Sequence, residues 1–137
     1  MSRNATAWLS MVLSLALHVY DEAVSGFLPF YNQSVLDLRA RLGAFPAPTF
    51  TFPVWITGLV TAILIAAALT PIVARGGRPI RLVCGAVAVV MVANALGHML
   101  GSMYFGTILP GFWSAPLLLA TSLWMARRAL FAGWQDA

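Results

Sequence analysis

Residues 52–74 read FPVWITGLVTAILIAAALTPIVA, and no charged side chain interrupts them. An apolar run of about 20 residues is long enough to cross the hydrocarbon core of a bilayer as a helix. A helix is also the element that satisfies its own backbone hydrogen bonds without a partner strand. This stretch therefore predicts a membrane-spanning helix and an all-α membrane protein.

The composition of the whole chain supports the same class. Of its 137 residues, 61% are hydrophobic and only 9% are charged, and the mean hydropathy is +0.86. Soluble domains carry about 25% charged residues, so this chain could not cover its surface in water. The composition excludes an ordinary soluble enzyme and a disordered tail. The net charge of +4 does not indicate a nucleic-acid partner, because the arginines lie at the ends of apolar runs.

Three further apolar segments are long enough to span a bilayer: residues 5–30, 80–106 and 109–131. Together with residues 52–74 they predict a single domain, residues 1–137, of four transmembrane helices. The first outer loop contains Ser34–Gly43, in which apolar side chains recur at helical spacing. We expect this segment to form a short amphipathic helix in the outer interface.

The arginines set the expected orientation, because cytoplasmic loops are enriched in positive charge. With four spans, six of the eight arginines fall on one side and only Arg39 and Arg41 fall on the other, where Asp37 partly offsets them. Both termini are therefore expected in the cytoplasm. A cleaved signal peptide is the competing interpretation of the N-terminus, but Val19-Tyr20-Asp21-Glu22 is a poor small-residue cleavage site.

The first span contains the polar turn His18-Val19-Tyr20-Asp21-Glu22. On a helix, His18 and Glu22 are four residues apart and share a face, and Asp21 flanks His18 on its other side. An ionised acid inside a membrane costs several kcal/mol unless it is paired, coordinated or hydrated. The chain has only four acids, and two of them lie here. This turn is therefore the first candidate site.

The third span contains Asn94-Ala95-Leu96-Gly97-His98, in which Asn94 and His98 again share a face. Counted from Thr6 and Ile80 at 1.5 Å per residue, His18 lies ~18 Å and His98 ~27 Å from the inner end of its span. By the same count Glu22 lies at ~24 Å and Asn94 at ~21 Å. The two polar turns overlap in depth, so they can meet if the helices are neighbours.

The favoured interpretation is a metal site formed by His18, Glu22 and His98, with Asp21 as a further ligand or general base. Two imidazoles and one or two carboxylates suit zinc, or iron in a two-histidine-one-carboxylate arrangement. No organic cofactor is indicated. With Asp21, Glu22 and Asn94 in catalytic roles, the protein would be a metal-dependent hydrolase or oxidoreductase of the membrane. Its substrate would be a lipid or another apolar molecule, because a buried site is most easily reached from the bilayer.

Two alternatives use the same residues without a metal. The His–carboxylate pair could act as a general base or as a proton or cation path in a small transporter or channel. The polar residues could also only join the helices, as in a scaffold subunit without chemistry of its own. A dinuclear carboxylate-bridged centre is excluded, since it needs about four carboxylates. Tyr20, Tyr104 and the methionines of the third span are weaker candidates, because such residues usually anchor or pack.

The order of these motifs resembles that of the HXXEE family of small integral membrane proteins. The resemblance rests on His18-Val19-Tyr20-Asp21-Glu22, on Asn94-Ala95-Leu96-Gly97-His98, and on Tyr104 followed by Pro110-Gly111. It covers most of the chain. The first acid of the motif is Asp21 here rather than Glu, which shortens the reach of that carboxylate. The resemblance supports the choice of residues and implies no particular reaction.

The expected location is the cytoplasmic membrane of a bacterium, which the small size and the use of arginine as the sole basic residue type favour. The expected partners are membrane lipids and an apolar small-molecule substrate, with no nucleic acid. A homo-oligomer is expected above all if the protein is a transporter, since four spans enclose little space.

Overall fold

The computed structural model describes residues 2–131, and every regular element within them is a helix. Met1 and residues 132–137, which include Asp136, lie outside the described residues. The all-α class is confirmed for the described part of the chain, and the single domain 1–137 stays a prediction. The helices are α1 (Arg3–Ser25), α2 (Phe27–Leu42), α3 (Phe52–Ala68), α4 (Thr70–Arg75), α5 (Arg78–Phe105) and α6 (Ala115–Leu130).

The predicted membrane spans agree with the structure in part. Two helical stretches, Phe52–Arg75 and Arg78–Phe105, are long and apolar enough to cross a membrane. A third exists if α1 and α2, which meet at a bend of 75°, form one broken span. Helix α6 has 16 residues, which gives about 24 Å and falls short of the ~30 Å hydrocarbon core. The structure supports two or three spans, and the predicted number of four is not shown.

Two of the predicted spans are not continuous helices in the structure, and glycines explain both breaks. The first predicted span, 5–30, breaks at Gly26, whose φ of 84° ends α1; the amphipathic segment predicted at 34–43 is therefore part of a longer helix, α2. The fourth predicted span, 109–131, begins as a loop, because Gly106 and Gly111 take φ values of 62° and 83°. Its helix starts at Ala115.

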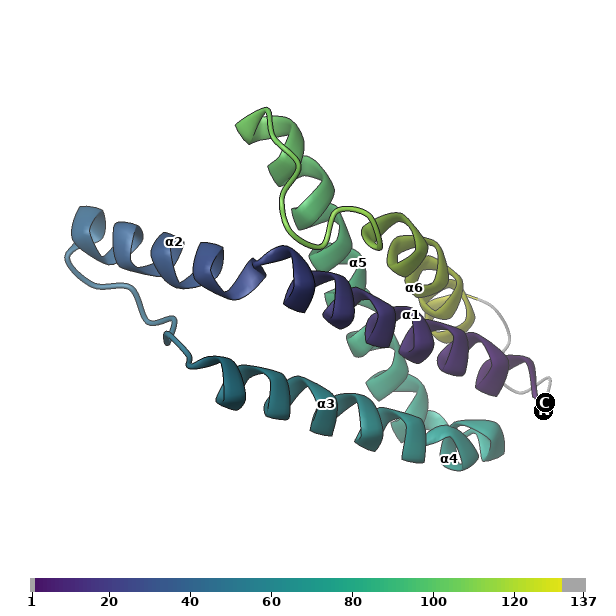
Figure 1. Cartoon of the computed structure of the whole chain (residues 1–137). Helices are drawn as coiled ribbons and strands as arrows, with labels where there is room; N and C mark the ends of the chain where they lie inside the picture. Colours follow the sequence, from purple (N-terminus) through teal and green to yellow (C-terminus); the bar gives the residue numbers. More distant parts are fainter. Residues whose placement is uncertain (1, 132–137) are drawn as a thin grey trace.

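Helix α1 lies between α6 on one side and α3 with α4 on the other, and α5 packs against α6 (Figure 1). The buried core joins all of these helices. It contains Trp8 and Met11 from α1, Val73 from α4, Cys84 and Ala88 from α5, and Met125 and Ala129 from α6. Because this core occupies the half of α1 that includes Trp8, the polar turn of α1 lies beyond it, beside the loop that connects α5 to α6.

At the end of the molecule opposite that loop, hydrogen bonds from arginines connect the ends of α1, α5 and α6. The guanidinium of Arg128, in the last turn of α6, donates to Asn4 Oδ1 at 2.7 and 2.9 Å. Arg81, in the first turn of α5, donates to the carbonyl of Ala129. A cation near the last carbonyls of a helix is stabilised by the helix dipole. This end carries the arginines whose pattern predicts a cytoplasmic location.

The bend at Gly26 can be tested with a matched glycine. Gly26→Ala should destabilise the protein by about 1–2 kcal/mol, because a Cβ is strained in the left-handed region. Gly58→Ala is the control: Gly58 lies inside α3, and a Cβ there meets nothing within 4 Å. That variant should be neutral or more stable by up to about 1 kcal/mol. Unfolding by SDS in mixed micelles, followed by tryptophan fluorescence, measures both; equal stability of the two variants would contradict the bend.

Candidate functional site

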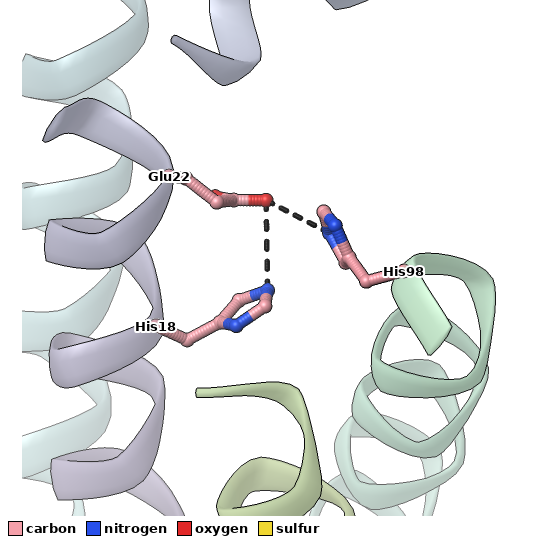
Figure 2. A group of neighbouring side chains, drawn as sticks. All are labelled: His18, Glu22 and His98. Carbon is pink, nitrogen blue, oxygen red and sulfur yellow. Dashed lines mark ion pairs between the residues drawn. The ribbon is translucent and has the colours of Figure 1, made fainter. Parts of the chain in front are cut away.

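The polar turns of α1 and α5 meet as the sequence predicts. Glu22 Oε1 lies 3.0 Å from His98 Nε2 and 3.5 Å from His18 Nε2, and the side chains converge from two helices (Figure 2). The exposed fractions of His18, Glu22 and His98 are 0%, 5% and 7%. The two imidazoles meet edge to face, with their centroids 4.7 Å apart. Three potential ligands therefore share one space from which water is largely excluded.

The loop between α5 and α6 determines which nitrogen of His98 faces Glu22. The Nδ1 atom of His98 lies 2.6 Å from the carbonyl oxygen of Pro110. A carbonyl only accepts, so Nδ1 is the protonated nitrogen that donates. In the neutral ring, Nε2 therefore has a free lone pair. This lone pair is directed at Glu22.

A chain of hydrogen bonds orients His18 in the same way. Asp21 Oδ2 accepts from the backbone N–H of Ser114 at 3.0 Å and from its hydroxyl at 2.7 Å. Because the single hydroxyl proton is donated to this carboxylate, Ser114 Oγ is the acceptor for His18 Nδ1, which lies 2.8 Å away. His18 Nε2 then has the lone pair, and it accepts a hydrogen bond from Asn94 Nδ2 at 3.1 Å.

Gly111 makes this arrangement sterically possible. A Cβ at position 111 would lie 2.9 Å from ring atoms of His98 and 3.0 Å from a ring atom of His18. Gly111 also has a φ of 83°, a conformation that other residues rarely adopt. The turn Pro110-Gly111 therefore supplies a carbonyl to one histidine and leaves room for both rings.

The resulting cluster has two imidazole lone pairs and one carboxylate oxygen in the same small volume, with ligand atoms all within 4.8 Å of one another. Two acceptors 3.0 Å apart, such as His98 Nε2 and Glu22 Oε1, repel each other unless a proton or a cation lies between them. The site can thus hold a proton or bind a cation, and both outcomes use the same atoms.

The structure places the other predicted site residues close by but in different positions. Asp21 does not contribute to the three-atom cluster, because its carboxylate is bound to Ser114. Asn94 contacts His18. Tyr20 and Tyr104 are exposed to 66% and 84%, and both lie at the surface of the protein. Met91 and Met99 pack on an apolar cluster around Ala95 and Leu118.

Sequence reasoning missed Ser114, which connects Asp21 to His18. One signal was present: a serine immediately before Ala115-Pro116 is a typical start of a helix. In the structure Ser114 does precede α6, but its side chain makes no capping hydrogen bond. The hydroxyl donates to Asp21 instead, and the two residues are 93 positions apart in the sequence.

Comparison with known protein families identifies the family of this chain, and the match covers most of its length. Residues 8–125 match the model of the family described as proteins of unknown function with an HXXEE motif. The chain belongs to the HXXEE family. No curated protein and no solved structure gives a significant match.

The HXXEE motif corresponds here to His18, Asp21 and Glu22, and the structure assigns its acids different positions. The second acid, Glu22, faces both histidines. The first, Asp21, faces away from them and accepts two hydrogen bonds from Ser114. The substitution of Asp for the first Glu of the motif therefore affects a residue that orients His18, and not one of the three clustered ligand atoms.

The role of Ser114 can be tested by comparison with Ser122, which is also buried. Ser114→Ala leaves Asp21 and His18 without their shared partner and should cost about 1–3 kcal/mol. Ser122 Oγ makes no hydrogen bond within residues 2–131, so Ser122→Ala should be neutral or stabilising. SDS unfolding titrations of both variants provide the comparison. If Ser114→Ala were as stable as the wild type, the chain from Asp21 to His18 would not exist.

Proposed function

We propose that this protein is a membrane enzyme that binds one divalent metal ion through His18, Glu22 and His98 and acts on an apolar substrate. One observation carries the proposal. Both histidines donate Nδ1–H to acceptors elsewhere in the protein, so both unprotonated Nε2 atoms lie beside the Glu22 carboxylate, at 3.0 Å for His98 and at 3.5 Å for His18, whose Nε2 also accepts from Asn94. Histidines that bind metals are oriented in this way by the partner of the second nitrogen.

The distances between the potential ligand atoms support a metal of the first transition series. Zinc bonds of 2.0–2.2 Å to nitrogen and oxygen require ligand atoms ~3.3 Å apart in a tetrahedral site. The distances from Glu22 Oε1 to the two Nε2 atoms are 3.0 and 3.5 Å. The donor set also suits iron in a two-histidine-one-carboxylate site. The two distances from Glu22 therefore fit either ion, and all three ligand atoms lie within 4.8 Å of one another.

A bound ion with an open position supplies a Lewis acid and an activated water. The roles of this chain's residues follow from their contacts. His18, Glu22 and His98 hold the ion. Asp21 acts through Ser114 as a positioning residue for His18. Asn94, whose amide donates to His18 Nε2 at 3.1 Å, would leave this nitrogen to the ion and orient a substrate at the open position. An apolar substrate is proposed because the helices around the site are apolar enough to lie in a membrane.

A second candidate function is proton transfer without a metal. The 3.0 Å distance between two acceptors, His98 Nε2 and Glu22 Oε1, favours a shared proton when no cation is bound. In that case proteoliposomes should show a proton flux that Glu22→Gln abolishes. A protein that binds metal tightly and carries no protons would exclude this candidate.

Metal content tests the main proposal directly. Protein purified through a tag without histidines and without chelators should contain about one zinc or iron ion per chain, because three protein ligands suffice for a catalytic site. His18→Ala, His98→Ala and Glu22→Gln should each lose it, as measured by mass spectrometry of the elements. Asp37→Asn is the control, since Asp37 binds Gln33 on α2 instead. Wild-type protein without metal, even after dialysis against zinc or ferrous iron, would refute the proposal.

The positioning role of Asp21 predicts a weaker but intact site. Asp21→Asn should bind the same number of ions with roughly 10–100-fold lower affinity, the usual effect of removing the partner that orients a ligand. A titration against a competing chelator measures this affinity. Complete loss of metal would instead indicate that Asp21 is itself a ligand. Unchanged affinity for the metal would show that Ser114 orients His18 without help from the Asp21 carboxylate.

A further inference from the structure

A cavity of about 290 Å³ opens directly beside the cluster, between α2 and α5. Asn94, Gly97 and His98 contribute to its wall from α5, and Phe27 and Phe30 contribute from α2. The rings of Phe27 and His98 are in contact, with centroids 5.3 Å apart. His98 is therefore both a member of the buried cluster and part of the wall of an apolar cavity.

A second cavity, of about 380 Å³, follows the first along α2. Phe30 lines both cavities, and Phe105 of α5 lines the second. The rings of Phe30 and Phe105 meet edge to face at 6.2 Å. Figure 1 shows that α2 leaves the end of α1 in one direction while the last turns of α5 point in another. We call the two cavities together the α2–α5 cleft.

The polarity of the α2–α5 cleft changes along its length. Its inner end carries the polar side chains of Asn94 and His98, and aromatic rings follow. Its outer end carries Gln33, Asp37 and Arg41. A cleft that is apolar in the middle and polar at both ends fits an amphiphile whose chain carries or approaches a reactive group at the inner end.

The charges at the outer end indicate the head of this amphiphile. Asp37 Oδ1 accepts a hydrogen bond from Gln33 at 2.8 Å. Arg41 is exposed and makes no ion pair with any residue of the described range 2–131. A guanidinium matches the geometry of a phosphate group, to which it can donate two parallel hydrogen bonds. Arg41 is thus the side chain to which a phosphate would bind.

We propose that the α2–α5 cleft binds a phosphate-bearing lipid, with the phosphate at Arg41 and one chain passing Phe30 and Gly97 to reach Asn94 and His98. This names the substrate class of the proposed metal enzyme and rests on that function for the chemistry at the inner end. The binding of the lipid itself depends only on the walls of the cleft. It can therefore be measured with or without a metal.

Gly97 offers a way to fill the cleft without disturbing the fold. A Cβ at Gly97 meets nothing within 4 Å, and Gly97 lines the inner cavity. The side chain introduced by Gly97→Leu should therefore fill the space that the lipid chain would occupy. Gly58→Leu is the matched control, because Gly58 is also helical and also meets nothing within 4 Å. Arg41→Gln removes the phosphate partner, and Arg75→Gln removes an equally exposed arginine beside the α4–α5 turn.

The test uses lysophosphatidic acid with a photoreactive diazirine near the end of its chain, and the monoacylglycerol with the same chain as the phosphate-free probe. Full-length protein in dodecyl maltoside is labelled with and without chelator, and labelled peptides are identified by mass spectrometry. We expect lysophosphatidic acid to label the peptides around Phe27–Phe30 and Gly97. This labelling should fall about tenfold in Gly97→Leu and in Arg41→Gln, as expected for a lost charged hydrogen bond or a blocked site, and should persist in both controls.

The outcomes separate this proposal from the metal proposal. Equal labelling of Gly97→Leu and Gly58→Leu, or equal labelling by the two probes, would overturn the lipid site. Metal content is measured on the same samples, and Gly97→Leu should retain it because Pro110 and Ser114 still orient the histidines. Specific labelling of a wild type that binds no metal even after dialysis against zinc or ferrous iron would uphold the lipid site and refute the metal enzyme. Bound metal without specific labelling would uphold the metal site and overturn the lipid site.

Discussion

The structure depends most on the need to neutralise one buried carboxylate. Glu22 is 5% exposed in a chain composed mostly of apolar residues, and an isolated ionised acid in such a place costs several kcal/mol. Within residues 2–131, the contacts between a carboxylate and a basic side chain are both made by Glu22, with His18 and His98, and they neutralise its charge when a proton or a cation lies between the groups. Helix α5 must therefore approach α1 closely enough for His98 to reach Glu22, and this requirement sets the register between the two helices.

The loop between α5 and α6 gives the cluster its chemical character. Without it, each imidazole could present either nitrogen to Glu22. Pro110 and Ser114 accept from the two Nδ1 atoms, and Gly111 allows both rings to approach. This arrangement shortens the last helix. The segment before Ala115, which could have extended α6 toward a full span, forms the loop, and α6 has 16 residues. The same loop therefore explains the orientation of the histidines and the short length of α6.

The bend between α1 and α2 links the cluster to the surface. Because the chain bends by 75° at Gly26, directly after α1 ends, Phe27 contacts His98 and Phe30 lines the cavity beside it, and neither continues the axis of α1. A straight first span would have left the cluster beside a continuous helix. The bend opens the α2–α5 cleft instead, so a residue that the sequence presents as an ordinary glycine gives the cluster its apolar approach.

The sequence alone determined the helical class, an apolar run at residues 52–74 that is long enough to cross a membrane, and the choice of His18, Glu22 and His98. These features follow from composition and from spacing within one helix, which are local properties. Only the tertiary structure decided that Asp21 binds Ser114 while Glu22 faces His98, since adjacent residues on a helix point in different directions and these partners lie 93 and 76 residues away in sequence. The bend at Gly26 and the late start of α6 were also beyond prediction, because apolar composition predicts burial in lipid and says little about where a backbone turns.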